Sequence, residues 1–165
     1  MIAVEHHARL ASADRGGIDT LEHPVPVGRG RVWEFFNDLE KNYKAWHPGD
    51  HVVCRWTKGK PHEVGSIVYA EEVLAGRLCK ISMLCTKIET NKRIEYRTLF
   101  PLSLFHPRSM YLLEEKGQRT VFTAVNFFRV PRLFKRRVET LIEATEKHVK
   151  EEGQNLKRLL EIKNG

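Results

Sequence analysis

The last third of the chain carries a long helical repeat, and this repeat constrains the fold more than any other feature. From position 131 to position 162, apolar residues recur at steps of three and four, which predicts one amphipathic helix of about 30 residues. Pro131 suits the first position of such a helix. An apolar stripe of this length has to be covered by other elements of the domain. The predicted stripe contains Val138, Leu141, Ile142, Thr145, His148 or Val149, Glu152, Leu156, Leu159 and Leu160.

The region before this helix predicts an antiparallel sheet. Six segments are rich in β-branched and aromatic residues, and hairpin-sized gaps separate them, which is typical of a meander. A further edge strand is expected at 18–27, because Pro24 and Pro26 restrict pairing there, and a helix is expected at 31–42. The six segments are residues 51–57, 64–74, 78–89, 93–100, 109–115 and 120–129.

The predicted order is strand, helix, several antiparallel strands and a long terminal helix. This order resembles the START-like, Bet v 1-type helix-grip architecture, an α+β fold in which a curved antiparallel sheet wraps around a long C-terminal helix. At 165 residues the chain has the length of one domain. We assign the START-like domain to residues 17–165 and a loose N-terminal arm to residues 1–16. Such a resemblance of topology does not define the chemistry.

Composition excludes several classes of protein. Hydrophobic residues make up 41% of the chain and charged residues 30%, values that are ordinary for a globular domain and exclude a disordered chain. No run approaches 18 apolar residues, so no membrane span or membrane partner is expected. The N-terminus lacks the order of a signal peptide. The lack of a signal peptide, together with only three cysteines (Cys54, Cys79 and Cys85), predicts reduced thiols in a cytoplasmic protein.

The net charge of +7 is open to two interpretations. It fits a nucleic-acid-binding protein, and it equally fits a protein whose charge prevents self-association. The basic residues are scattered, apart from one cluster at 129–137, and no recognised nucleic-acid motif accompanies them. We therefore expect no nucleic-acid partner, although the cluster could mark an anion site.

Two polar residues interrupt the apolar stripe of the terminal helix. His148 and Glu152 are four residues apart and therefore share one helix face, which should turn toward the sheet. A buried carboxylate is costly without a partner. Glu152 could simply hydrogen-bond His148 or an arginine of the sheet, or the register could place Val149 inside and His148 at the rim. A shared metal ion is the third explanation.

Further potential ligands lie in the predicted sheet. His47, Asp50 and His51 gather where the first helix gives way to the first long strand. Glu71 and Glu72 are adjacent in a strand, so only one of them faces inward, and alternation leaves open which one although it favours Glu72. Two histidines with two carboxylates suit zinc, with Fe(II) or Mn(II) as alternatives.

These motifs resemble the diacetylphloroglucinol/phloretin hydrolase family. The resemblance implies a zinc-dependent enzyme that hydrolyses the carbon–carbon bond between an acyl group and a phenolic ring. It assigns His51, Glu72, His148 and Glu152 as metal ligands, and Tyr43, His106 and Tyr111 as substrate-contacting catalytic residues. The expected partner is a hydrophobic aromatic small molecule, and a homodimer is compatible with the sequence. The matching motifs are Tyr43-Lys-Ala-Trp46-His47-Pro48-Gly-Asp50-His51, Glu72-x-x-x-Gly76 and His148-Val-Lys-Glu-Glu152-Gly-Gln-Asn155-Leu156-Lys-Arg-Leu159-Leu160.

Alternative functions remain open from the sequence. The chain could be a non-enzymatic carrier or sensor of a hydrophobic small molecule, which predicts an apolar cavity and no metal. It could be a metal-free polyketide cyclase/aromatase, in which His47, His51 or Tyr43 would act as acid/base groups. A metal with four closed protein ligands would serve stability alone.

Overall fold

The computed structural model describes residues 17–117 and 119–162, and the arm expected at 1–16 lies outside the described residues. The described residues form an antiparallel sheet in the order β1-β7-β6-β5-β4-β3-β2, followed by a long helix, α3. The strands are β1 (Gly17–Val25), β2 (His51–Lys58), β3 (Ile67–Leu74), β4 (Arg77–Glu89), β5 (Arg93–Thr98), β6 (Arg108–Lys116) and β7 (Arg119–Phe128). The helices are α1 (Arg29–Asn37), α2 (Leu39–Trp46) and α3 (Lys135–Ile162), with single 3-10 turns η1 (Leu102–Leu104) and η2 (Arg132–Phe134).

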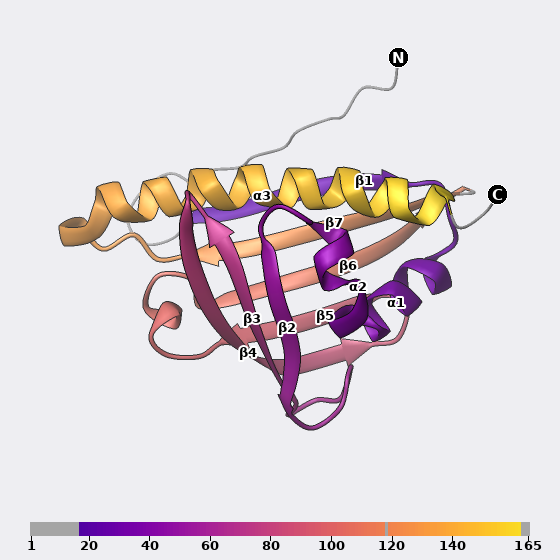
Figure 1. Cartoon of the computed structure of the whole chain (residues 1–165), viewed down its shortest axis with the longest axis horizontal. Helices are drawn as coiled ribbons and strands as arrows, with labels where there is room; N and C mark the ends of the chain where they lie inside the picture. The colour runs from indigo at the N-terminus through magenta and orange to yellow at the C-terminus, as the bar shows by residue number, and fades with distance from the viewer. Residues whose placement is uncertain (1–16, 118, 163–165) are drawn as a thin grey trace, which may run out of the picture.

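The sheet curves around α3, as the order of elements predicted. Figure 1 shows β1 and β7 running beside α3, whereas β2, β3 and β4 cross below it at a steep angle. Every neighbouring pair is antiparallel, and β1 joins the sheet through β7 rather than through its neighbour in sequence. None of the helices in the described part of the chain has both the length and the apolar character needed to cross a bilayer.

Two predicted boundaries were wrong. The single helix expected at 31–42 is two helices, because Asp38 leaves the helical conformation and serves as C-cap of α1 and N-cap of α2. Asn42 supports this corner by donating a side-chain hydrogen bond to the carbonyl of Phe35 at 2.9 Å. The terminal helix begins at Lys135 rather than at Pro131, because the 3-10 turn η2 comes first.

The core lies between the sheet and α3. The stripe predicted on α3 faces it: Val138, Ile142, Leu156 and Leu160 are buried. Trp46 at the end of α2 is 1% exposed, and its Nε1 donates a hydrogen bond to the carbonyl of Glu152 at 3.0 Å, which ties α2 to α3.

Gly153 allows α3 to approach β1 closely. A Cβ atom at this position would lie 2.0 Å from Nδ1 of His23. His23 received no role from the sequence, and the structure shows that it is buried in β1 under the helix. The missing side chain of Gly153 therefore sets the distance between helix and sheet at the level of Glu152.

Candidate functional site

The four predicted metal ligands converge at one place between the sheet and α3. His51 begins β2 and is paired in register with Glu72 of β3, while His148 and Glu152 come from successive turns of α3. The Nε2 atoms of His51 and His148 are 3.1 Å apart, and Oε1 of Glu152 lies 3.1 Å from Nε2 of His51. Oε2 of Glu72 lies 3.6 Å from Nε2 of His148 and 4.0 Å from Nε2 of His51. The spacing of these residues within each element places them on the inward faces of the strands and of α3. The curvature of the sheet then brings the ligand atoms close together.

The sequence left open whether Glu71 or Glu72 faces inward, and in the structure it is Glu72. Glu72 points toward α3 and accepts a hydrogen bond from the Tyr43 hydroxyl at 3.2 Å. Glu71 points to the other face of β3, where it accepts a hydrogen bond from Tyr69 and lies 3.6 Å from Nζ of Lys80. The alternative register, with His148 at the rim, is wrong, since His148 and Val149 are 5% and 6% exposed and both face inward. The other alternative, a direct contact between Glu152 and His148, is present, because Oε1 of Glu152 lies 3.7 Å from Nε2 of His148.

Hydrogen bonds orient both imidazole rings. Nδ1 of His51 lies 2.7 Å from the main-chain carbonyl of Tyr43, which can only accept, so Nδ1 carries the proton. Nδ1 of His148 lies 3.3 Å from Oδ2 of Asp50 and donates to that carboxylate. In the neutral tautomers both Nε2 atoms are therefore unprotonated and face one another. A second partner that holds the ring in this way is typical of metal-binding histidines.

With both imidazoles in these neutral tautomers, the arrangement favours a bound cation. Two unprotonated Nε2 atoms at 3.1 Å, with Glu152 Oε1 3.1 Å from one of them, place only lone pairs against one another. Ligands bonded at about 2.0–2.2 Å in a tetrahedron are about 3.3–3.6 Å apart, so the observed separations suit a small divalent metal. His51, Glu72 and His148 offer ligand atoms that all lie within 4.8 Å of one another. The residues present therefore fit a metal ion.

Without a metal, a proton on His148 can supply the positive charge of the site. Burial alone would lower the pKa of His148, but the hydrogen bond to Glu72 and the charges of Glu152 and Glu72 raise it to about 9. Burial raises the pKa of Glu72, yet the hydrogen bond and charge of His148, with smaller contributions from His51 and Tyr43, lower it overall. An imidazolium on His148 between two carboxylates thus satisfies the site without metal.

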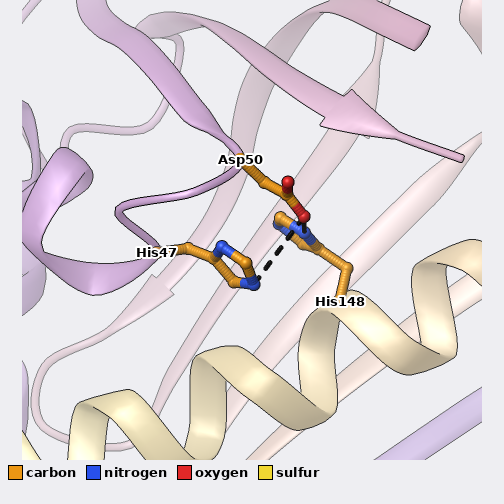
Figure 2. Close-up of side chains that lie close together, drawn as sticks. All are labelled: His47, Asp50 and His148. Carbon is orange, nitrogen blue, oxygen red and sulfur yellow. Dashed lines mark hydrogen bonds and ion pairs between the residues drawn. The ribbon is translucent and has the colours of Figure 1, made fainter. Parts of the chain in front are cut away.

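A second cluster lies on the solvent side of His148. Figure 2 shows the carboxylate of Asp50 next to His148 and directed toward His47, with Oδ2 of Asp50 3.8 Å from Nε2 of His47. Nε2 of His47 is 2.9 Å from Oε2 of Glu151. The two rings are stacked, with centroids 4.5 Å apart and planes at 16°, so a metal could not lie in both ring planes. This cluster therefore supports the orientation of His148 and is a poor second metal site.

A partly open pocket adjoins the four predicted metal ligands. It has a volume of about 80 Å³, and Glu72, His148 and Glu152 form part of its wall. His51 is not among the lining residues, because its side chain is fully buried behind them. The rest of the lining is mostly apolar and includes Leu39, Val68, Ile81, Met83, Leu102, Phe128 and Leu141. Because an apolar cavity of about 150 Å³ holds benzene, a phenolic ligand would require some of these side chains to move.

The three residues predicted to contact substrate all line this pocket. The ring of Tyr43 stacks on His51 at a centroid distance of 3.7 Å. Burial, and then the charges of Glu72 and Glu152, raise the pKa of Tyr43 far above its ordinary range; burial does the same to the pKa of Tyr111. Both phenols are thus permanent donors. Burial lowers the pKa of His106, which keeps its imidazole neutral near pH 7.

Sequence reasoning missed two buried polar residues of the pocket, Ser109 and Asn126, and the role of Asp50 outside it. Asn126 lines the pocket, and its Oδ1 lies 3.1 Å from Nε2 of His106. Its signal was present, since it is a polar residue at an inward position of β7, between Ala124 and Phe128. Asp50 was interpreted only as part of a turn or of a polar group, and its contact with His148 depends on the packing of α3.

Comparisons with known proteins define the fold. No protein-family model matches the chain, and no curated protein matches it in sequence. Among solved structures, the ZhuI aromatase/cyclase from Streptomyces sp. R1128 is similar with a TM-score of 0.73, 13% identity and coverage of 88% of this chain and 94% of that chain. A norcoclaurine synthase from Thalictrum flavum gives 0.72 at 15% identity, covering 93% and 100%. Major latex-like protein 151 from Panax ginseng gives 0.61 at 12% identity, covering 81% and 97%.

These similarities confirm the predicted fold class. The chain has a Bet v 1-like helix-grip fold, with an antiparallel sheet against a long C-terminal helix. At identities of this size the similarity shows the fold alone, because proteins of one fold carry out different chemistries. Function therefore has to be argued from the residues of the site.

Proposed function

We propose that the protein is a metal-dependent hydrolase that cleaves the carbon–carbon bond between an acyl group and a phenolic ring. His51, Glu72, His148 and Glu152 would hold the metal, with zinc as the preferred ion and Fe(II) or Mn(II) as alternatives. One observation carries the proposal: the Nε2 atoms of two imidazoles, both protonated on Nδ1, face each other at 3.1 Å beside two carboxylates. The likeness of the sequence motifs to the diacetylphloroglucinol/phloretin hydrolases adds the reaction type.

The proposed reaction consumes one water molecule. The bond between the ring carbon and the carbonyl carbon breaks, the carbonyl carbon gains hydroxyl and leaves as a carboxylic acid, and the ring carbon gains hydrogen. With one coordination position left for water besides the protein ligands, a bound divalent metal would supply Lewis acidity and lower the pKa of that water toward about 7. The wall formed by Glu72, His148 and Glu152 would place the acyl carbonyl next to the metal ligands.

The residues of the pocket would manage the ring. Tyr43 and Tyr111 remain protonated. Tyr111 would donate a hydrogen bond to a phenolic oxygen, and Tyr43 would do so in place of its present bond to Glu72, which stabilises the charge that the leaving ring develops. His106 is neutral, is held by Asn126, and can deliver or accept the proton at the ring carbon. The apolar remainder of the lining favours a flat aromatic substrate.

The metal site is tested by elemental analysis of the purified chain. We expect about one zinc per chain, and loss of that zinc in His148→Ala and in Glu152→Gln, which preserves the shape of the side chain. Glu143→Ala, an exposed substitution on the same helix, is the matched control and should retain the metal. A native chain that binds none of zinc, iron or manganese after metal is added refutes the site.

The reaction is tested with acylated phloroglucinols. We expect release of the free phenol and one carboxylic acid, abolished by chelation and restored by zinc. Tyr43→Phe should reduce turnover while keeping the metal, because it removes a donor but no ligand. Metal binding without turnover of any acylphenol would refute the hydrolase while leaving the metal site intact.

A metal-free cyclase or aromatase is the second candidate. The raised pKa of His148 supports it, because an imidazolium between Glu72 and Glu152 satisfies the site and can act as an acid. The similarity in fold to an aromatase/cyclase is consistent with it. This candidate predicts that treating the protein with a chelator leaves its thermal stability unchanged. The metal-dependent hydrolase predicts that the same treatment lowers the thermal stability.

A further inference from the structure

Large apolar side chains are exposed at one end of the molecule. Leu133 is 86% exposed and Phe100 is 78% exposed, while Leu104 and Phe134 are 50% and 38% exposed. These four residues belong to two short segments, the η1 turn with the residue before Pro101 and the η2 turn before α3. We call these four residues the apolar tip. Exposing these apolar side chains to water costs free energy, and the side chains are too exposed to contribute to the core.

The two segments of the apolar tip lie side by side. The rings of Phe105 and Phe134 are in edge-to-face contact with centroids 5.6 Å apart, and the main-chain N–H of Arg129 donates to the carbonyl of Phe105 at 2.7 Å. A small buried cluster of Phe128, Val138 and Ile142 packs against Phe105, directly after η1, and against Val130, just before η2. Figure 1 shows η1 and the start of α3 at the same end of the molecule, away from α1 and α2. The tip is therefore a supported surface that projects into solvent.

Basic residues surround the apolar tip. We call them the basic collar, and all of its side chains are exposed. Residues 97–110 and 127–138 contain no acidic residue. Within the described part of the chain, the collar has one ion pair, between Lys135 and Glu139 at 3.7 Å. A surface groove of about 310 Å³ lies beside the η1 segment and is lined by Arg97, Phe100 and Arg129 among others. The collar consists of Arg97, Arg129, Arg132, Lys135, Arg136 and Arg137.

The tip also adjoins the partly open pocket. Leu102 of η1 lines the pocket, while Phe100 and Leu104 on either side of it are exposed. On the helix, Leu141 lines the pocket one to two turns after the collar residues Arg136 and Arg137. A surface that contacts the apolar tip is therefore next to the part of the pocket wall formed by Leu102 and Leu141.

We propose that the apolar tip and the basic collar form a docking surface for an anionic lipid bilayer. Exposed leucine and phenylalanine side chains insert at the boundary between headgroups and acyl chains, and a ring of arginine and lysine binds the anionic headgroups. Both requirements are met here by adjacent residues. The docking is peripheral and needs no membrane-spanning segment. It is also independent of the proposed hydrolase activity, because it uses none of the proposed site residues.

The same charges could be expected to bind nucleic acid, but the apolar tip argues against this partner. Phe100 and Phe134 could stack on bases, but the two leucines of the tip, Leu104 and Leu133, neither pair with phosphate nor provide a flat surface for stacking. Leu133 is the most exposed of the large apolar residues in the described part of the chain and lies between Arg132 and the Lys135–Arg137 run. A bilayer is the partner that uses the charged and the apolar residues together.

The proposal is tested by sedimentation of the full chain with lipid vesicles. We expect binding to phosphatidylcholine vesicles that contain phosphatidylserine and none to phosphatidylcholine alone. Leu133→Glu combined with Phe100→Glu should reduce the partition coefficient by more than tenfold. Arg132→Gln combined with Arg136→Gln should reduce it by about 25-fold, at about fivefold for each charge removed. Leu133→Trp should report insertion by a blue shift of its emission in the presence of the anionic vesicles.

Matched control variants lie on the distant β2–β3 loop. Val64 is 66% exposed, so Val64→Glu tests an exposed apolar residue away from the tip, and Lys58→Gln with Lys60→Gln removes two charges away from the collar. Both controls should retain vesicle binding. Equal losses in the controls and the tip variants would overturn the proposal, as would no binding of the native chain to anionic vesicles. Collar-dependent binding of RNA or DNA without vesicle binding would assign the surface to nucleic acid instead.

Discussion

Asp50→Asn gives the sharpest test of how the proposed metal centre is built. Asp50 contributes no atom to the proposed ligand set, yet its Oδ2 lies 3.3 Å from Nδ1 of His148 and directs Nε2 of that ring toward Glu72 and His51. Asparagine keeps the size and one carbonyl oxygen but removes the charge. Loss of an outer partner of this kind lowers metal affinity by about 10–100-fold, which corresponds to about 1.4–2.7 kcal/mol.

The size of the effect on thermal stability follows from mass action. Zinc at 100 times the dissociation constant of the native chain stabilises it by about 2.7 kcal/mol, which raises Tm by about 5–11 °C for a chain of this length. If Asp50→Asn weakens binding by about 30-fold, the same zinc concentration contributes about 0.9 kcal/mol, or about 2–4 °C. The variant should thus lose most of the zinc-dependent rise while its metal-free Tm changes little.

Two measurements check this reasoning. Zinc affinity is measured by competition with a chromophoric chelator, and Tm is measured with and without zinc. Asp38→Asn is the matched control, because Asp38 is exposed and pairs only with Lys41 in the structure. An affinity of Asp50→Asn within twofold of the native value would refute the orienting role of Asp50. An identical loss in Asp38→Asn would show that general charge, rather than the contact with His148, controls the affinity.

Three further predictions concern packing, thiol chemistry and the pocket. Gly153→Ala should lower the free energy of unfolding by about 1–3 kcal/mol in a denaturant titration, because its Cβ would clash with His23; Gly30→Ala, with open space around it, should be neutral or mildly stabilising. Burial, and then nearby carboxylates, raise the pKa of Cys54 to about 12, so only about 10⁻⁴ of this thiol is ionised at pH 8 and alkylation should require unfolding. Tyr43→Phe should weaken zinc binding less than Asp50→Asn does, measured by the same chelator competition, because Tyr43 contacts one oxygen of Glu72 only.

Most of the fold and part of the candidate site could be predicted from local sequence patterns. The steps of three and four on α3 predicted which face is buried, and they placed His148 and Glu152 on that face before any partner was known. Helix and strand periodicity are properties of one element, so residues a few positions apart are enough to reveal them. The same local reasoning failed at Asp38 and at η2, where capping and a short turn outweigh a periodic pattern.

The sequence by itself thus determined the order of the elements, their inward faces and the residue types available for a metal. Only the tertiary structure decided that Glu72 rather than Glu71 points inward, that Asp50 holds His148, and that Leu133 and Phe100 project from a common surface. These facts depend on the curvature of the sheet and on the position of α3 across it. They join residues up to about a hundred positions apart, as in the contact between His51 and His148, and no local repeat encodes such distances.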